Sequence, residues 1–284
     1  MKIGIFANHN KPQAKETANV VAKLITKYGG EGLIFPDSAK GAELSGPIAR
    51  DIIENSDMII VLGGDGTIIR LAKIASLFNL PILGVNLGRL GFLSEVEKDG
   101  DLERAVEKII KGDYTVEERS MLSIKCGSIE YVSLNEVMLG RYSQKIISAD
   151  LFIDDKFFYN YYADGLLVST STGSTAYSLS AGGPILCPGV KAMVVTAVCP
   201  HSLYNRSIVV GENQKIDLKV SKKSPSAILM VDGEYKCELC EKDVVTVSSS
   251  SKKARFVRID EYNFFTRLTS KLNTWSISSE DKND

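Results

Sequence analysis

Along the first 115 or so residues, short runs of apolar side chains alternate with longer stretches in which apolar residues recur at helical spacing. The short runs predict strands at 3–6, 32–35, 56–62 and 81–85. The longer stretches predict helices at 14–28, 47–55, 68–75 and 101–111. This alternation is typical of βαβ units, so we expect a parallel sheet with flanking helices.

After Tyr114 the pattern changes to many short apolar runs separated by Gly, Asp, Ser and Lys. These runs predict strands at 122–124, 149–153, 192–198, 215–220, 227–231 and 244–247. Regularly spaced short strands indicate a second, all-β domain. We therefore expect an α/β nucleotide-binding domain at 1–115 and a β-rich domain at 116–256. The aromatic, amphipathic segment that follows, 257–284, either caps the β-rich domain or returns to the first one.

Composition excludes several classes of protein. The chain has 284 residues, of which 44% are hydrophobic, and this is enough apolar content to exclude global disorder. Its 34 Lys and Arg against 35 Asp and Glu give a formal charge of −1, which lacks the basic field of a nucleic-acid or polybasic membrane binder. Five cysteines spread over the chain do not form a dense disulfide framework. With no apolar run near the ~18 residues of a membrane span and no signal-peptide core, a cytoplasmic protein is expected.

The sharpest local motif is Gly63-Gly64-Asp65-Gly66-Thr67, between an apolar strand and a helix. Three glycines in four positions allow positive φ angles and let backbone N–H groups approach a ligand without obstruction by Cβ atoms. The following helix N-terminus adds a positive dipole, so the turn is predicted to bind phosphate. An ordinary strand-to-helix turn needs only one glycine and an N-cap.

Two common nucleotide motifs are excluded. No Gly-Lys dipeptide occurs in the chain, so there is no P-loop, and Ile69 stands where a dinucleotide fingerprint needs its third glycine. A carboxylate in a phosphate-binding turn repels phosphate unless it has a use. Asp65 is therefore predicted either to accept a proton from an attacking hydroxyl or to hold Mg²⁺.

A second signal is the loop from Asp164 to Gly189, which is rich in Gly, Ser and Thr. Its hydroxyls and amides offer neutral hydrogen bonds, and Tyr177 offers a stacking face, so the loop is suited to a nucleoside. A flexible linker is the alternative. Asn135-Glu136 adds an amide that can read a base edge and a carboxylate that can accept ribose hydroxyls, although such a pair also occurs in ordinary turns.

Together these motifs strongly resemble the NAD kinase family over nearly the whole chain. The resemblance rests on 63–67, on Asn86-Leu87-Gly88-Arg89-Leu90-Gly91-Phe92-Leu93, on Leu134-Asn135-Glu136-Val137 and on the Thr172-Gly173-Ser174-Thr175-Ala176-Tyr177-Ser178 loop. The Gly-Gly-Asp-Gly turn alone is weak, since lipid kinases and phosphofructokinases share it. The Asn-Glu pair and the long hydroxyl-rich loop are more specific.

The resemblance assigns a role to individual residues. It implies that Asp65 is the general base for the adenosine ribose 2′-hydroxyl of NAD, that Gly66 contacts phosphate or ribose, and that Arg70 neutralises phosphate charge. Asn135 and Glu136 would hold the adenosine, and Asp164 and Ala176 the adenine or amide edge. The remaining implied substrate contacts are Phe92, Lys145, Tyr162, Thr175, Tyr177, Ser178, Leu179, Ser180, His201 and Glu234. Glu234 stands where many relatives carry Gln or Arg, so its role stays open.

The resemblance also implies an activity, a cofactor and an assembly. The activity is phosphoryl transfer from ATP or polyphosphate to NAD, with a divalent cation, Mg²⁺, carried by ATP. The assembly is a homodimer or homotetramer with active sites near subunit contacts. Two alternatives remain open: a lipid kinase of the diacylglycerol type, and a catalytically silent NAD sensor. No metal-ligand set is predicted, because Cys237 and Cys240 lack a second pair and His9 and His201 lie far apart.

Overall fold

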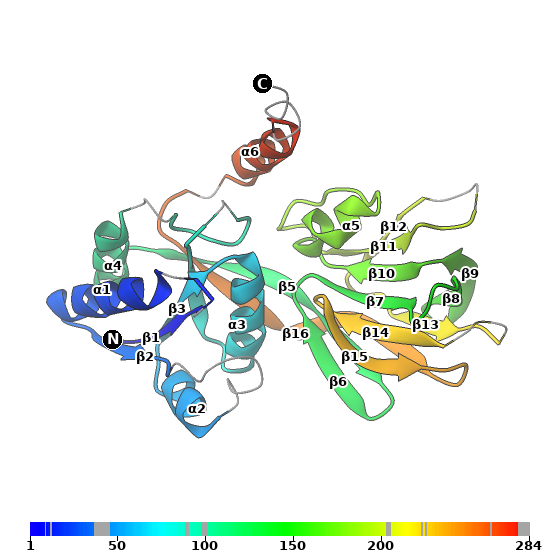
Figure 1. Ribbon diagram of the computed structural model, residues 1–284, viewed down its shortest axis with the longest axis horizontal. Helices are drawn as coiled ribbons and strands as arrows, with labels where there is room; N and C mark the ends of the chain where they lie inside the picture. Colours follow the sequence, from blue (N-terminus) through cyan, green and yellow to red (C-terminus); the bar gives the residue numbers. More distant parts are fainter. Residues whose placement is uncertain are drawn as a thin grey trace. The chain divides into compact units, whose positions relative to one another are not determined.

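The computed structural model describes residues 1–8, 10–11, 13–36, 46–88, 91–97, 101–202, 206–222, 224, 226–261 and 263–277. The chain divides into two compact units, one formed by 1–118 with 254–284 and the other by 119–253 (Figure 1). Two long strands, β5 (Thr115–Cys126) and β16 (Val244–Arg258), run from one unit into the other.

The first unit is an α/β structure. Its elements are β1 (Lys2–Ala7), α1 (Ala14–Lys27), β2 (Glu31–Ile34), α2 (Pro47–Glu54), β3 (Met58–Gly63), α3 (Asp65–Leu77), β4 (Pro81–Asn86), α4 (Leu102–Lys111) and α6 (Phe264–Ile277). The strands are parallel in the order β2-β1-β3-β4-β16. Because the chain order reverses between β1 and β3, ligands are expected at the carboxyl ends of these strands.

Helices cover both faces of this parallel sheet. Ile3, Ile5, Met58 and Ile60 point into one core cluster with the buried faces of α1 and α4. On the opposite face, α2 approaches β1 at Gly4, and α3 approaches β4 at Gly84. All six residues of β3 are therefore buried, which explains its uninterrupted apolar sequence.

The second unit contains two layers of antiparallel strands. One is the six-stranded sheet β12-β11-β10-β7-β14-β15, formed by Ile208–Gly211, Ala192–Val198, Gly165–Ser169, Glu136–Arg141, Ala227–Val231 and Glu234–Leu239. The other contains β13 (Ile216–Val220), β8 (Ile147–Ile153) and β9 (Lys156–Ala163) beside the first half of β16, and β6 (Ile129–Ser133) pairs with β5. Leu139 and Leu166 from the six-stranded sheet share one core with Leu151 and Leu218 from the other.

The predicted fold class is confirmed: an α/β N-terminal unit with a parallel sheet precedes a β-rich part. Helix α3 begins at Asp65, three residues before the predicted start at Ile68, because Asp65, Gly66 and Thr67 already form its first turn and Gly64 is its N-cap. Strand β9 was not predicted, since its sequence KFFYNYYA carries aromatic side chains without polar alternation and most of them are exposed. No helix among the described residues is both long and apolar enough to cross a lipid bilayer.

Candidate active site

The Gly63–Thr67 segment forms the junction between β3 and α3 at the carboxyl edge of the parallel sheet. Gly64 is the N-cap of α3 with φ −98° and ψ 179°, and Asp65 is the first helical residue. The first N–H groups of a helix have no partner within the helix, so this junction presents donors and a positive dipole to an anion. Asp65 is partly exposed and Gly66 is exposed.

The explanation that the three glycines are needed for positive φ angles is wrong. None of Gly63, Gly64 and Gly66 has a positive φ. A Cβ atom added at Gly63 would lie 2.8 Å from Thr67, whereas one added at Gly64 or Gly66 would find no atom within 4 Å. Residue 63 is therefore glycine because the Thr67 side chain lies too close for a Cβ atom. Gly64 and Gly66 leave open space beside the backbone, which a bound ligand requires.

The Asp65 carboxylate is held by the segment that follows β4. It accepts the backbone N–H of Phe92 at 2.8 Å on Oδ2 and that of Leu93 at 3.3 Å on Oδ1. Gly91 is buried, and a Cβ there would overlap the same carboxylate. A carboxylate has about four acceptor positions, so these two bonds orient it and leave it able to accept further hydrogen bonds.

The other predicted residues of the first unit lie close to this junction. Arg70 follows Asp65 on α3, with its guanidinium 5.4 Å from the ring centre of Phe6. Its Nε is buried without a hydrogen-bond partner in the described part of the chain. The ring of Phe92 packs against Phe264, with ring centres 6.4 Å apart. The structure thus brings Asp65, Gly66 and Phe92 together, with Arg70 on the same helix.

Asn8 is a candidate that the sequence analysis missed. It follows β1, the strand beside β3, and its side-chain amide donates to the Thr67 hydroxyl at 2.8 Å. The available signal was position, because polar residues directly after adjacent parallel strands meet at the same edge of the sheet.

In the second unit, Asp232 organises the Asn135-Glu136 segment. Its carboxylate accepts hydrogen bonds from the Ser133 hydroxyl at 2.6 Å and from three backbone N–H groups, those of residues 134, 135 and 136, at 2.8–3.3 Å. The Asp232 N–H donates to the Glu136 carbonyl at 2.9 Å. The sequence analysis did not single out Asp232, since only the folded chain shows that a turn about a hundred residues away holds this pair.

The hydroxyl-rich loop is ordered and does not behave as a flexible linker. The Thr170 N–H donates to the Asn135 carbonyl at 2.9 Å, and its hydroxyl donates to the Leu134 carbonyl at 2.6 Å. The Ser174 hydroxyl donates to the Ser171 carbonyl at 2.6 Å. A Cβ at Gly173 would overlap the Asn135 carbonyl. The loop is therefore packed directly on the Asn-Glu segment.

Predicted residues 175–180 continue from this loop through a short helix, α5 (Tyr177–Ser180). Tyr177 and Ser180 are exposed, and Thr175, Ala176 and Leu179 are partly exposed. Ser178 is different, because its side chain is fully buried and its hydroxyl lies 3.2 Å from that of Thr196. The Ser178 side chain thus faces the interior, and only its backbone remains as a candidate substrate contact.

The structure separates the predicted residues of the second unit into two groups at opposite ends of the six-stranded sheet. In the register of β10 with β7, Ser169 pairs with Glu136 and Gly165 pairs with Gly140. We call these ends the Glu136 end and the Asp164 end. The Glu136 end carries Asn135, Glu136, the 170–175 loop and Glu234, whose carboxylate pairs with Lys236 at 2.8 Å.

The Asp164 end carries Asp164, Lys145, Tyr162 and His201. Asp164 pairs with Arg141 at 3.0 Å, and exposed Lys145 follows in the next turn. The backbone carbonyl of Tyr162 accepts the backbone N–H of His201 at 2.8 Å. Both residues line a pocket of ≈ 380 Å³ with Phe157, Tyr159, Asn160, Tyr161, Pro200 and Ser202.

Burial raises the pKa values of two groups of the second unit that are at least partly buried. Burial raises the pKa of Tyr161, which lines this pocket. Burial also raises the pKa of the Cys126 thiol to about 11, with a smaller contribution from Cys237. Cys126 is therefore protonated at neutral pH and is a poor nucleophile. Among the described residues, no group of three or more His, Cys, Asp or Glu side chains is placed to hold a metal ion.

The fold and site define a protein with an α/β unit, in which a helix N-terminus lies at the carboxyl edge of a parallel sheet, and a β-rich unit with an ordered hydroxyl-rich loop. A family model described as the ATP-NAD kinase N-terminal domain matches residues 3–114, and one described as the ATP-NAD kinase C-terminal domain matches residues 134–259. An NAD kinase of Thermoanaerobacter sp. (strain X514) is 36% identical over 279 residues, which cover 95% of this chain and 98% of the relative.

Two solved structures are also similar. Yeast NADH kinase complexed with NADH has a TM-score of 0.82 and 27% identity, covering 96% of this chain and 87% of that one. An NAD kinase from Archaeoglobus fulgidus in complex with ATP has a TM-score of 0.76 and 25% identity, covering 96% and 99%. The chain belongs to the NAD kinase family, and the predicted resemblance is confirmed. The lipid kinase and silent sensor alternatives gain no support from these comparisons.

Proposed function

We propose that this protein is an NAD kinase that transfers the γ-phosphoryl group of ATP to the adenosine ribose 2′-hydroxyl of NAD, giving NADP and ADP. The observation that carries the proposal is the arrangement at Asp65. Its carboxylate is oriented by two backbone N–H groups and stands in the first turn of a thirteen-residue helix beside exposed Gly66. A fixed carboxylate within an anion-binding junction suits an attacking alcohol next to a phosphate.

The reaction needs few protein groups. The 2′-hydroxyl oxygen attacks the γ-phosphorus, the bond between this phosphorus and the β,γ-bridging oxygen breaks, and Asp65 takes the hydroxyl proton. Phosphoryl transfer depends chiefly on positioning and charge neutralisation. General-base assistance of this kind typically contributes ~10²–10⁴-fold. Helix α3 supplies its N-terminal N–H groups, and Arg70 supplies a cation on the same helix.

A divalent cation, Mg²⁺, fits the donor chemistry of this site. Carboxylate and phosphate oxygens are the ligands that Mg²⁺ prefers, and it is commonly held by one or two carboxylates together with substrate phosphates. Because Asp65 is assigned as the general base, the cation would be held mainly by the phosphate oxygens of ATP. When bound with ATP, the cation neutralises the charge of the phosphate oxygens.

In the second unit, we assign the adenosine of NAD to the Glu136 end. Asn135 and Glu136 would hold it, and Thr175, Ala176 and Tyr177 would close over it. The rigidity of this region supports the assignment, because Asp232 fixes one side of the Asn-Glu segment and Thr170 fixes the other. A preorganised pocket loses less entropy when it binds a ligand.

The same geometry supports a homo-oligomer. The five residues of β10 run from one end to the other, and its first and last residues are four spacings, or about 13 Å at ~3.3 Å per residue, apart. An adenosine held at Asn135 therefore does not reach Asp164 of the same chain. We assign the Asp164 end, with Lys145, Tyr162 and His201, to the nucleotide of a second copy in a homodimer or homotetramer.

The balanced charge supports a cytoplasmic protein that binds neither nucleic acid nor membrane.

The direct test is to incubate the protein with NAD⁺, ATP and Mg²⁺ and to quantify NADP⁺ with an NADP-specific dehydrogenase. We expect ATP-dependent NADP⁺ formation. Replacing ATP with polyphosphate and NAD⁺ with NADH, each in a separate reaction, identifies the preferred donor and acceptor. Phosphorylated diacylglycerol without NADP⁺ would contradict the proposal, as would NAD⁺ binding with no consumption of ATP.

Assembly has its own test. Light scattering should give a mass at least twice the 31.0 kDa of one chain. Co-refolding Asn135→Ala chains with Asp164→Ala chains should recover activity that neither variant has alone, because mixed assemblies contain intact composite sites. A monomeric protein, or a co-refolded mixture no more active than either variant alone, would overturn the assignment of the Asp164 end to a second copy. Neither result would affect the proposal that the protein is an NAD kinase.

A further inference from the structure

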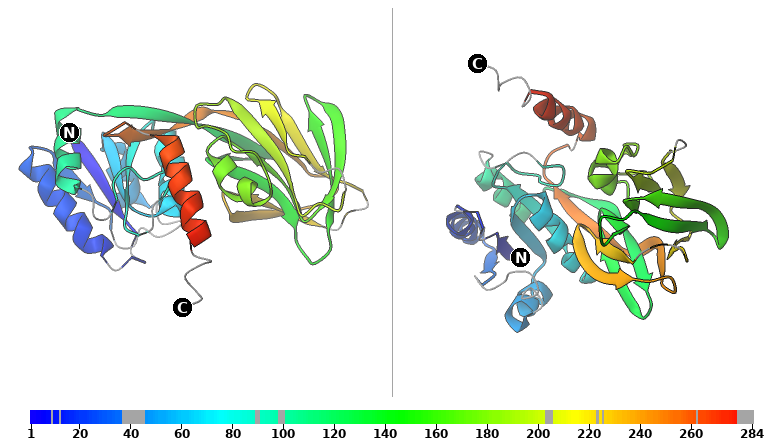
Figure 2. Two further views of the ribbon diagram at one scale, coloured as in Figure 1. Left: turned by 90° about the horizontal axis from the view of Figure 1, so that it is seen from above. Right: turned by 45° about the vertical axis from the view of Figure 1, so that its right-hand side comes forward.

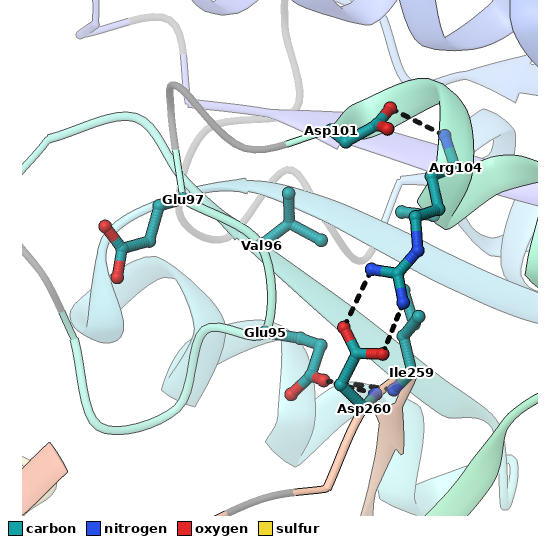
Figure 3. Close-up of a pocket in the computed structure, with 8 residues that line it drawn as sticks. Glu95, Val96, Glu97, Asp101, Arg104, Ile259 and Asp260 are labelled. Atoms are coloured by element: carbon teal, nitrogen blue, oxygen red, sulfur yellow. Dashed lines mark hydrogen bonds and ion pairs between the residues drawn. The ribbon is translucent and has the colours of Figure 1, made fainter. Parts of the chain in front are cut away.

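In the first unit, the end of β16 and the residues after it bind the segment that follows β4 through ion pairs and hydrogen bonds. Arg258, at the end of β16, is almost fully buried and pairs with Glu95 at 3.0 Å and with Glu117 at 2.7 Å. Glu95 also accepts the backbone N–H groups of Ile259 and Asp260, at 3.0 and 3.3 Å. Figure 3 shows the hydrogen bonds of Glu95 to the backbone of Ile259 and Asp260, and those of Arg104 to Asp260. These residues line a pocket of ≈ 380 Å³.

Helix α6, drawn in red in Figure 2, follows β16 in the chain. It makes a second set of contacts with the segment that follows β4. Arg267 donates through Nη1 to the carbonyl of Gly91 at 3.3 Å and to the carbonyl of Ser94. Beside it, Phe264 packs on the ring of Phe92, and the ammonium of Lys271 lies 5.4 Å from the centre of that ring.

The two residues between these carbonyls are the ones that bind Asp65. Phe92 and Leu93 donate their N–H groups to its carboxylate, while Gly91 and Ser94 accept from Arg267. The segment 91–94 is thus held between the carboxylate of α3 and the guanidinium of α6. A shift of Arg267 would move the two N–H groups that orient Asp65.

From these contacts we infer that Arg267 is a positioning residue for the phosphoryl transfer, acting on Asp65 through the 91–94 backbone. The inference rests on the proposed role of Asp65 as general base. Arginine suits this task because its planar guanidinium offers several N–H donors in a fixed geometry. Lysine offers one compact ammonium group, so Arg267→Lys should retain only part of the wild-type turnover. Reactions that depend on orientation lose up to about 100-fold for a misplacement of ~1 Å.

The test compares Arg267→Met, Arg267→Lys and a matched control on the same helix, Thr269→Ala. The exposed Thr269 hydroxyl donates to the Phe265 carbonyl at 2.9 Å. Turnover is measured per folded molecule, and the Kd for NAD⁺ is measured by equilibrium titration. Arg267→Met should lower kcat by about 10–100-fold and leave the Kd within about twofold. Arg267→Lys should fall between Arg267→Met and the wild type, and Thr269→Ala should match the wild type.

A double-variant comparison separates this inference from the activity assignment. If Arg267 acts through Asp65, Arg267→Met should not lower the residual turnover of Asp65→Asn any further. A normal kcat per folded molecule in Arg267→Met, or an equal fractional loss in both backgrounds, would overturn the positioning role. Full turnover of Asp65→Asn itself would instead overturn the proposed general base.

Discussion

The carboxylate of Asp65 and the backbone N–H of Phe92 form a hydrogen bond of 2.8 Å that joins two consecutive strand ends of the parallel sheet. Asp65 follows β3 and Phe92 follows β4, so the bond fixes the carboxylate at the sheet edge where ligands bind α/β proteins. The contact also explains why residue 91 is glycine, since any side chain there would take the place of the carboxylate.

Gly91→Ala tests this relationship. The added methyl group overlaps the Asp65 carboxylate, so either the carboxylate or the 91–94 segment must move, and we expect kcat to fall by about 10–100-fold. Steady-state kinetics of NADP⁺ formation measures the effect. Gly88→Ala is the control, because the nearest atom to its added methyl group is 3.7 Å away. Equal activity of the two variants would show that the fit around Asp65 is not needed.

Asp232→Ala should weaken both stability and NAD binding. It removes the acceptor of four hydrogen bonds to residues 133–136. Buried donors left unpaired cost about 1–3 kcal/mol, so we expect the free energy of unfolding to fall by about 2–4 kcal/mol. Urea denaturation and NAD⁺ titration measure the two effects.

The control for this change is Asp243→Ala, another turn aspartate of the same unit. The Asp243 carboxylate accepts one exposed N–H within the described part of the chain, that of Cys240 at 2.7 Å. We expect its loss to cost less than about 1 kcal/mol and to leave the Kd for NAD⁺ unchanged. A Kd unchanged in Asp232→Ala as well would contradict the role of Asn135 and Glu136 as the adenosine site.

The Arg104–Asp260 pair predicts a pH dependence of stability. The hydrogen bond from Arg104 holds the pKa of Asp260 below its usual value. The stabilisation is therefore complete above the unfolded-state pKa of about 3.9 and disappears as the pH falls through the lower folded-state value. The effect should be small, since both side chains are at least half exposed.

Thermal unfolding of Asp260→Asn measures this contribution. Its Tm should lie below that of the wild type at neutral pH, and the difference should narrow once the pH falls below about 4. Glu261→Gln, which changes an exposed neighbouring carboxyl, serves as the control. A Tm difference that grows on acidification would contradict the assigned sign.

The sequence predicted the elements of the first unit well because helical periodicity and buried apolar runs are local signals. Asp65 was singled out because a carboxylate among phosphate-binding glycines is chemically unexpected. Its hydrogen bonds to Phe92 and Leu93 could not be predicted, since they join the ends of different strands. Asp232 and Arg267 were missed for the same reason. Ser178 was assigned by its place in a motif, and only packing against Thr196 shows that its hydroxyl faces inward.

The hydroxyl-rich loop shows the limit of composition most clearly. Its Gly, Ser and Thr content fits both a flexible linker and a binding loop. Burial decides between them, because Ser171 and Ser174 are at most 1% exposed. Their hydroxyls donate to carbonyl groups of the loop itself, at Pro188 and Ser171. Thr170 also ties the loop to Leu134 and Asn135, and no local sequence pattern predicts that contact.

The most direct test of the central claim compares wild-type protein with Asp65→Asn for NADP⁺ formation from NAD⁺ and ATP, together with the Kd for NAD⁺. Asparagine has nearly the same shape but cannot take the proton of the 2′-hydroxyl. We predict a kcat lower by about 10²–10⁴-fold with NAD⁺ binding retained. An Asp65→Asn variant with near-normal kcat would contradict the account.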